Sequence, residues 1–252
     1  MSQRPVAGGA VRWLDVELPT VAENLALDEA LLAEAHDGEF AGTVVRSWMA
    51  AEHAVVLGSS SHVSAEVDLA ACDAAGVAVV RRPSGGLTVA VGPGCLMWSV
   101  VATWPEPAPA IDALHAAFLD PLAAALGAAG RAVVRRGSSD LALDVAGCLR
   151  KVSGNALRVR RQAVLYHGTL LDDFDLALVS RVLRHPPREP EYRGGRDHGS
   201  FLANLRLGRR PLEQAVRQAF AAAAERHDWP RERVAELVRQ RYRDGGWTHR
   251  LS

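Results

Sequence analysis

Between residues 132 and 170 the chain contains four strand-like segments in direct succession, and no other feature constrains the fold as strongly. Each segment is rich in β-branched or alternating apolar residues, and short turns separate them at 132–135, 140–145, 151–158 and 163–170. Parallel strands need a crossover of about a dozen residues or more, so this run predicts antiparallel pairing. A Rossmann domain is excluded, because regular βαβ alternation and a GxGxxG turn are both missing.

Helices and further strands are predicted on both sides of this run. Thr20 and Glu23 form a capping-box pattern that begins a helix extending to Ala35. Other helices are predicted at 67–75, 111–129, 176–183, 212–226 and 231–241, and strands at 11–18, 44–48, 54–58, 77–80 and 95–103. We therefore expect an α+β fold with a mixed, largely antiparallel sheet and flanking helices. One domain spans residues 1–252 in this interpretation, with C-terminal helices from about residue 212 packing on it.

Charge and cysteine content narrow the function classes. The formal net charge is zero, which argues against nucleic acid or an anionic membrane as a partner. Residues 1–10 lack the apolar stretch of a secretory signal, and no apolar run reaches the roughly 20 residues of a membrane span. Three cysteines without CxxC spacing predict neither disulfides nor a zinc site. We expect a cytoplasmic protein.

Lysine usage singles out one position. Of the 29 basic residues 28 are arginine, and Lys151 is the sole lysine. A position that keeps an ammonium among so many arginines indicates a need for a compact point charge, although chance survival is the alternative. Lys151 begins the run Lys-Val-Ser-Gly-Asn-Ala, where a cation beside backbone donors would stabilise charge on an acyl phosphate. The plain alternative is an exposed lysine next to a glycine bulge.

Two further motifs have the residue types of an anion site. Residues 81–86 read Arg-Arg-Pro-Ser-Gly-Gly after a predicted strand, and a segment beginning at His167 reads His-Gly-Thr-Leu-Leu. Glycines let the backbone approach a ligand closely, and arginines bind phosphate or carboxylate with two hydrogen bonds. Taken singly, the first motif is equally compatible with an ordinary turn, and His167 with a structural histidine. The stretch 185–200, rich in Pro, Gly and Arg, predicts an ordered loop.

In their order and spacing these motifs resemble the lipoate–protein ligase A family. Residues 81–86 resemble its RR-x-SGGG loop, residues 139–141 its NDL strand, residues 151–156 its K-(V/I)-SG-(S/N)-A segment and residues 167–171 its HHGTLL strand. Similarity extends to an NLA helix at 24–29, a VVIG strand at 55–58, and Tyr242 and Trp247 near the end of the catalytic domain. It covers nearly the whole chain, without the family's C-terminal accessory domain.

The resemblance implies the biotin/lipoate ligase catalytic-domain fold, which is similar to class II aminoacyl-tRNA synthetases. It implies that ATP, with Mg²⁺ entering alongside it, activates lipoate or octanoate to an acyl-adenylate. The acyl group then passes to a lysine of a lipoyl-domain acceptor, such as a 2-oxoacid dehydrogenase subunit, a glycine-cleavage H protein or a related protein. A separate accessory protein is a further implied partner, and no resident metal is implied.

In this resemblance Lys151 is the catalytic residue, contacting the acyl carbonyl and the adenylate phosphate, and an apolar tunnel between sheet and helix takes the acyl chain. The residues implied to bind nucleotide and acyl group come from all four motifs: Arg82, Ser84, Gly85, Gly86, Leu87, Thr88, Val89, Ala90, Asp140, Ser153, Gly154, Asn155, Ala156, His167, Gly168 and Thr169.

Departures from the family pattern lie on the nucleotide side. Leu87 stands in place of the third loop glycine, residues 91–92 replace its HD pair, and Cys95 replaces an asparagine. Two alternatives therefore stay open. One is an octanoyltransferase acting through a cysteine thioester, although residues 133–138, where those relatives place the nucleophile, contain no cysteine. The other is a non-catalytic binding protein on the same fold. A biotin ligase is disfavoured, because no GRGRxGR-like loop is present.

Overall fold

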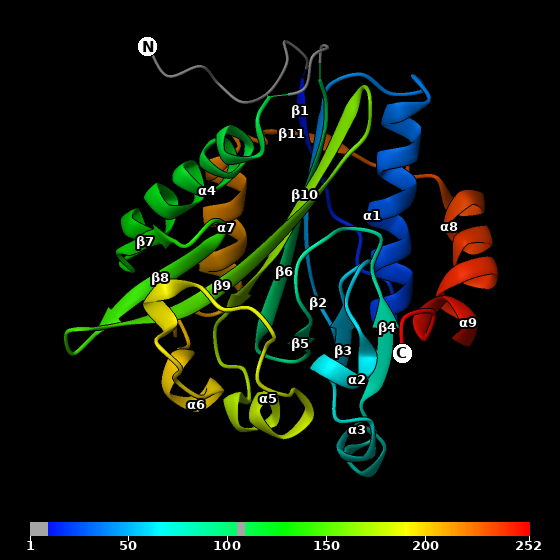
Figure 1. The fold of residues 1–252 in the computed structure, drawn as a ribbon. Coiled ribbons are helices and arrows are strands. Elements are labelled where there is room, and N and C mark those ends of the chain that lie inside the picture. Colours follow the sequence, from blue (N-terminus) through cyan, green and yellow to red (C-terminus); the bar gives the residue numbers. More distant parts are fainter. Residues whose placement is uncertain (1–9, 105–108) are drawn as a thin grey trace.

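The computed structural model describes residues 10–104 and 109–252, so the signal-sequence prediction lies almost wholly outside the described residues. The main sheet has eight strands in the order β11–β1–β2–β6–β10–β9–β8–β7 (Figure 1). β1 runs parallel to both of its neighbours, and every other pair is antiparallel. The predicted mixed, largely antiparallel sheet is confirmed. Its strands are β1 (Val11–Leu14), β2 (Thr43–Met49), β6 (Cys95–Thr103), β7 (Val133–Arg136), β8 (Asp140–Val145), β9 (Cys148–Val159), β10 (Ala163–Leu171) and β11 (Ala224–Arg226).

One face of this sheet is covered by two helices over a mainly apolar core, in which His115 and the Tyr166 hydroxyl bond each other (2.8 Å). α4 (Ile111–Ala128) and α7 (Arg209–Ala219) pack there, on the left in Figure 1. The aromatic rings of Trp98, Phe118, Tyr166 and Phe220 stack or tilt against one another between sheet and helices. By length and composition α4 could cross a membrane, but its leucines and Phe118 belong to this core cluster. We therefore assign α4 as a core helix.

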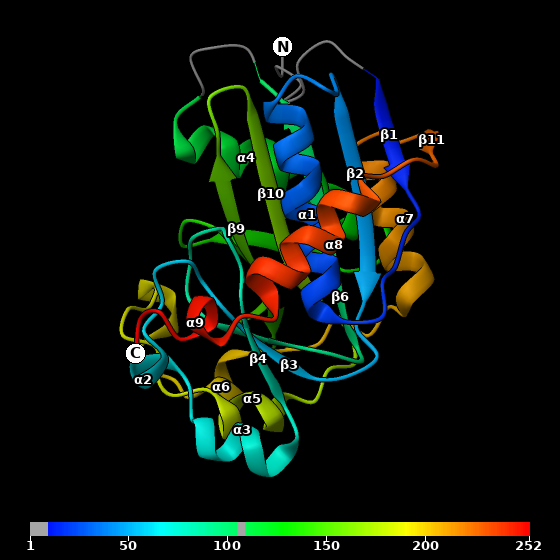
Figure 2. The ribbon, with the colours of Figure 1, turned by 90° about the vertical axis from the view of Figure 1, so that its right-hand side faces the viewer.

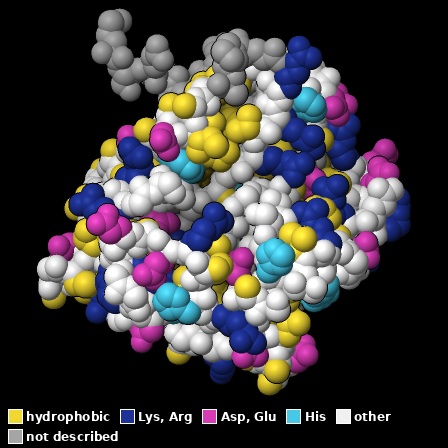
Figure 3. All heavy atoms as spheres, in the orientation of Figure 1, with side chains coloured by type: hydrophobic (Ala, Val, Ile, Leu, Met, Phe, Trp, Pro, Cys, Tyr) yellow, Lys and Arg dark blue, Asp and Glu magenta, His cyan; other side chains and the backbone are white. Residues whose placement is uncertain are grey.

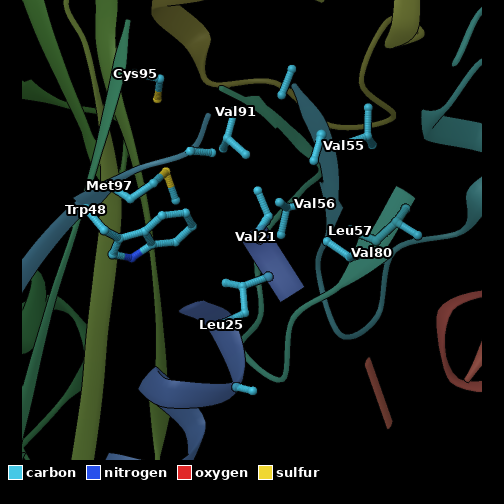
Figure 4. Packing of buried hydrophobic residues seen from close by; sticks show 14 of the residues in the cluster. Val21, Leu25, Trp48, Val55, Val56, Leu57, Val80, Val91, Cys95 and Met97 are labelled. Carbon is cyan, nitrogen blue, oxygen red and sulfur yellow. The ribbon is translucent and has the colours of Figure 1, made fainter. Parts of the chain in front are cut away.

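The opposite face carries α1 (Val21–His36) and a three-stranded sheet in the order β4–β3–β5. The strands are β3 (Ala54–Leu57), β4 (Ala78–Arg81) and β5 (Val89–Val91). Figure 4 shows their apolar side chains meeting those of α1 and the main sheet. α8 (Arg231–Leu237), continued by a π-helical turn (Val238–Tyr242), crosses over α1 (Figure 2). This face contains the functional site.

Short elements close the lower end of the molecule in Figure 1. They are α2 (Val63–Glu66), α3 (Leu69–Ala75), α5 (Leu176–Val182), a 3₁₀ turn (Glu191–Arg193) and α6 (His198–Phe201), while α9 (Gly245–Thr248) lies on the right, below α8. Residues 185–200, which we call the cover segment, are ordered as predicted. The cover segment is tied to β9, because the Arg196 guanidinium donates to the Leu149 carbonyl (3.0 Å). Just beyond it, the Ala203 amide donates to the Lys151 carbonyl (3.0 Å).

Several predicted boundaries were wrong, each for a local reason. The helix predicted at 212–226 begins at Arg209 and ends at Ala219, because Ala221 adopts a positive φ of 51° and the chain continues as β11. The first strand stops at Leu14, since the Leu18 backbone bonds to the Asn24 side chain and helps to begin α1. The helix predicted at 67–75 begins at Leu69, capped by Asp68, although Gly76 ends it as expected. β5 was not predicted.

Candidate active site

A cavity of about 450 Å³ opens between α1, the main sheet and the loop that follows β4. We call residues 82–92 of that loop the glycine loop. Figure 3 shows dark blue Lys and Arg side chains at the middle of this face, over β9 and the cover segment. The structure brings most of the predicted site residues to this one cavity: Arg82, Gly86, Leu87, Thr88, Val89, Asp140, Lys151, Gly154, Asn155, Ala156, His167, Gly168 and Thr169.

A β-bulge places Lys151 in the cavity. Asp140 pairs with Gly154 across β8 and β9, but Ala142 pairs with Lys151, so β9 holds one extra residue, Val152. A one-residue shift reverses which face of the sheet a side chain points to. Lys151 therefore shares a face with Asp140 and Gly154, while Val152 is buried in the apolar core on the other side.

Lys151 forms an ion pair within the cavity. Its Nζ lies 2.8 Å from Oδ1 of Asp140, and the Tyr192 hydroxyl donates to Oδ2 of the same carboxylate (3.0 Å). A Cβ at Gly154 would lie 3.0 Å from both Cε and Nζ of Lys151, so glycine there leaves room for the ammonium. Asp140 thus fixes the position of the one lysine, and the cover segment fixes Asp140 through Tyr192.

The glycine loop is held by hydrogen bonds of its own. Arg82 donates to Ser84 Oγ and to the carbonyls of Val56, Gly85 and Leu87, at 2.7–3.1 Å. Burial lowers the pKa of Arg82 to about 10, which leaves the guanidinium charged at neutral pH. Every one of these bonds is to the protein itself, so Arg82 shapes the loop in this state.

A buried carboxylate fastens the far end of the same loop. Glu66 Oε2 accepts hydrogen bonds from the Thr88 amide (2.8 Å), the Thr88 hydroxyl (2.7 Å) and Ser61 (3.0 Å). At Gly58 a Cβ would lie 1.9 Å from the Gly86 carbonyl oxygen, so only glycine lets β3 and the loop approach this closely. The glycine loop is therefore closed against the second sheet.

A buried polar network links this loop to the main sheet. Asp28 on α1 bonds Arg46 and Ser99, both at 2.8 Å, and lies 3.5 Å from His167 Nδ1. His167 Nε2 lies 2.6 Å from Ser84 Oγ. Ser84 Oγ also accepts from Arg82 Nε–H (3.0 Å), so the serine joins Arg82 of the loop to His167 of β10. Burial by itself raises the pKa of Asp28, but Arg46 and His167 hold it below its ordinary value.

Ser84, His167 and Asp28 are connected in the order of a hydrolase triad, yet they do not form a nucleophilic site. Ser84 is fully buried and lines neither cavity of this face. Its oxygen also accepts from Arg82, which lowers its nucleophilicity. The network instead holds the glycine loop to β10.

The inner end of the cavity is apolar. Leu25 of α1, Val56 of β3 and Met97 of β6 line it, so it lies between sheet and helix, where an acyl tunnel is expected. A second, narrower cavity of about 110 Å³ shares Lys151 and Leu87 with the first and extends under the cover segment to Phe201 and other apolar residues. No cysteine is among the described residues lining either cavity.

Four predicted site residues lie elsewhere. Ala90 lines the second cavity but not the main one. Ser84, Gly85 and Ser153 line neither; Ser153 is fully buried and accepts a bond from Asn155 (3.0 Å).

Other residues of the site were not predicted from the sequence. Leu25 and Val56 lie in the NLA and VVIG segments but were not named as site residues, and Met97 lies in no motif. Arg188 and Tyr192 reach the site only because the cover segment folds over β9. Within residues 10–104 and 109–252 no group of three or more His, Cys, Asp or Glu could hold a metal ion.

Fold and cavity define a catalytic-type domain with a lysine–carboxylate pair at the junction of two cavities. Residues 20–225 match the model of the lipoyl protein ligase A/B catalytic domain, and the chain belongs to this family, as predicted. Among its relatives is the octanoyltransferase LipM of Symbiobacterium thermophilum, 32% identical over 240 residues (85% of each chain). Lipoate–protein ligase 1 of Staphylococcus aureus is 25% identical over 243 residues, 90% of this chain and 69% of the relative.

Solved structures of the same fold include two ligases. A chain from the structure of a bipartite lipoate protein ligase and its E2 lipoyl domain from Thermoplasma acidophilum superposes with a TM-score of 0.82 at 23% identity, covering 96% of this chain and 97% of that one. A lipoate–protein ligase A bound with ATP gives a TM-score of 0.79 at 22% identity, covering 97% and 100%. The predicted catalytic-domain fold is confirmed.

Proposed function

We propose that the chain is a lipoate–protein ligase that activates lipoate or octanoate with ATP and passes the acyl group to a protein lysine. The observation that carries this proposal is the Lys151–Asp140 pair at the junction of two cavities whose described lining has no thiol. A lysine there suits adenylate chemistry, whereas a thioester route needs a cysteine in contact with the acyl group.

In the first half-reaction the acyl chain occupies the apolar end formed by Leu25, Val56 and Met97. Each buried methylene stabilises binding by about 0.8 kcal/mol. A carboxylate oxygen of the acid attacks the α-phosphorus of ATP, the bond to the β-phosphate oxygen breaks, and pyrophosphate leaves. The Lys151 ammonium stabilises the negative charge that builds on the α-phosphate.

In the second half-reaction an acceptor amine attacks the acyl carbonyl, the bond to AMP breaks, and an amide forms. Lys151 again neutralises the leaving phosphate, and Asp140 keeps the ammonium in place. Mg²⁺ enters with the nucleotide as part of the substrate. Both carboxylates among the described residues lining the main cavity are already paired, Asp140 with Lys151 and Glu189 with Arg193, so the ATP phosphates would take the place of protein ligands around Mg²⁺.

The nucleotide requires the glycine loop to open. Arg82 must exchange the carbonyls of Gly85 and Leu87 for phosphate oxygens, and the loop then closes again to exclude water from the acyl-adenylate. An ATP-bound ligase of the same fold supports a nucleotide in this cavity.

The acceptor in this proposal is a lipoyl domain. Support comes from the Thermoplasma acidophilum system, described as a bipartite ligase with its E2 lipoyl domain. That system also makes a separate accessory protein a reasonable partner here. We further propose a cytoplasmic location, where 2-oxoacid dehydrogenase subunits and glycine-cleavage H proteins would be accessible as acceptors.

An octanoyltransferase is the second candidate, because a relative of that name is 32% identical across 85% of both chains. The positions of the cysteines oppose it. Burial raises the pKa of Cys95 to about 12, and burial also raises the pKa of Cys72. Cys148 is exposed at the start of β9, where its Sγ accepts from Arg196.

Pyrophosphate exchange into ATP, measured with a panel of acids that includes lipoate and octanoate, tests the proposal. A ligase supports exchange that depends on one of these acids. Absence of exchange, together with octanoyl transfer from a carrier protein, would show that the transferase assignment is correct.

A further inference from the structure

The cationic side chains of the site differ in whether they already form hydrogen bonds or ion pairs within the protein. Among the described residues, four Lys or Arg side chains line the two cavities: Arg82, Lys151, Arg188 and Arg193. Arg82 is bound to loop carbonyls and Lys151 to Asp140. Arg193 bonds the Arg196 carbonyl, pairs with Glu189 and lies 4.8 Å above the Phe201 ring.

Arg188 is different. It is exposed, it lines both cavities, and it makes no hydrogen bond or ion pair with the part of the chain that the structure describes. Its backbone is nevertheless held. Pro186, Pro187 and Pro190 fix φ around it, and the neighbouring Glu189 accepts from the Gly195 amide (2.8 Å). The result is a free guanidinium on a fixed support at the cavity mouth.

Its position indicates what it binds. Lys151 and Arg188 are the two cationic side chains common to both cavities, so an anion at the junction lies between β9 and the cover segment. A guanidinium presents two parallel N–H donors that match the oxygens of a phosphate. The glycine loop, in contrast, departs from the family pattern at Leu87, and its Arg82 is already committed.

We propose that Arg188 binds the phosphates of ATP from the cover segment, on the opposite side from the contact that Arg82 makes once the glycine loop has opened. This inference rests on the proposed ligase function and adds a substrate-binding residue to it. It also assigns a role to the cover segment, which carries Arg188 to the nucleotide and, through Tyr192, holds Asp140 against Lys151.

The test compares three variants. Arg188→Ala removes the guanidinium, and Arg188→Lys keeps the positive charge without the two parallel N–H donors. Arg181→Ala is the control, because Arg181 is an exposed arginine of α5 that lines neither cavity and has no hydrogen-bond partner among the described residues. Two readouts are measured, the KM for ATP in pyrophosphate exchange and ATP affinity by calorimetry.

For Arg188→Ala the KM for ATP should rise about 10- to 100-fold, the effect of hydrogen bonds to a charged group. The KM for the acid and the exchange rate at saturating ATP should stay near wild type. The KM for ATP of Arg188→Lys should lie between those of wild type and Arg188→Ala, and that of Arg181→Ala should equal the wild-type value.

The outcomes separate the two claims. If wild type exchanges pyrophosphate and Arg188→Ala has an unchanged KM for ATP, the inference is wrong and the ligase function stands. If wild type neither exchanges nor binds ATP, both are wrong. If Arg188→Ala impairs only transfer from an octanoyl carrier protein, the phosphate that Arg188 binds belongs to that donor, which also overturns the nucleotide assignment.

Discussion

The two walls of the main cavity are built in different ways. The sheet wall, made by β8, β9 and β10, sets its side chains through strand register, and the bulge at Val152 brings Lys151 beside Asp140. The loop wall, residues 82–92, is held mainly by side-chain hydrogen bonds, which run from its own Arg82 to loop carbonyls and from Thr88 to Glu66 of α2. The sheet wall can act without rearrangement, whereas the loop wall must break bonds before a nucleotide enters.

Because of this difference, we expect the sheet wall to determine the rate of the reaction and the loop wall to determine how the nucleotide enters the cavity. A change in the sheet wall should lower the rate of reaction, because the cation at the reacting phosphate is displaced. A change in the loop wall should alter opening and nucleotide binding. The two walls meet in the Asp28–His167–Ser84 network, so its loss should affect both.

The largest effect is expected where the walls are joined. Asp28→Asn leaves Arg46 without a buried carboxylate, and losing one member of such a pair costs about 3–5 kcal/mol of unfolding free energy. Because the folded pKa of Asp28 is depressed, its contribution is present above the unfolded pKa of about 3.9 and is lost as pH falls through the folded value.

Urea denaturation of wild type and Asp28→Asn between pH 7 and pH 3 checks this prediction. The stability difference should narrow below about pH 4, because asparagine does not titrate. Asp173→Asn, which changes an exposed ion pair with Arg206, is the control and should alter stability by less than about 0.5 kcal/mol. A gap that stays constant with pH would contradict the charge assignment.

Lys151→Arg tests the sheet wall. A guanidinium cannot occupy the space over Gly154 that Nζ fills, and loss of one transition-state contact costs about 10²–10³ in rate. Acyl transfer should fall by that factor while circular dichroism and the denaturation midpoint stay unchanged. Arg150→Lys, one residue away on the other face of β9, should retain full activity. Near-wild-type turnover in a folded Lys151→Arg protein would remove Lys151 from the mechanism.

Glu66→Gln tests the loop wall. Hydrogen bonds to a charged group contribute about 1.5–3 kcal/mol, so weakening those at Thr88 should speed amide exchange there about 10- to 100-fold. Amides of β10 should exchange as in wild type, since strand pairing protects them. Hydrogen exchange read by mass spectrometry makes the comparison. Equal acceleration in both walls would show that they do not open independently.

Replacing the cysteines is expected to have no effect on turnover. A variant with Cys72→Ala, Cys95→Ala and Cys148→Ser should keep wild-type turnover, because no cysteine is among the described residues that line the site. Labelled acyl transfer measures this. A folded but inactive variant, with a thioester trapped on wild-type Cys95 or Cys148, would favour the transferase.

The sequence predicted the sheet wall better than the loop wall. Strand periodicity located the four successive strands, and the motifs located Lys151, Asp140 and His167. The bulge at Val152 was not predictable, because a register shift depends on which residues the neighbouring strand presents.

Contacts that depend on long-range packing were also missed. Asp28 meets Arg46 and Ser99 only when α1 lies on β2 and β6. Tyr192 and Arg188 sit in a Pro- and Gly-rich stretch without periodicity, so their place over β9 follows from anchors such as Arg196 to the Leu149 carbonyl. Four motifs separated in sequence identified the family. Only the structure shows that the Arg82 guanidinium is hydrogen-bonded to the carbonyls of Gly85 and Leu87.

Amide hydrogen exchange with and without a non-hydrolysable lipoyl- or octanoyl-adenylate analogue tests the central claim most directly, that both walls enclose one acyl-adenylate. In the free protein, residues 81–94 should exchange quickly compared with β10, because side-chain bonds rather than strand pairing hold most of this segment. The analogue should slow exchange strongly in residues 81–94 and around Lys151 to Ala156. Tight binding that protects neither segment would place the adenylate elsewhere and contradict the account.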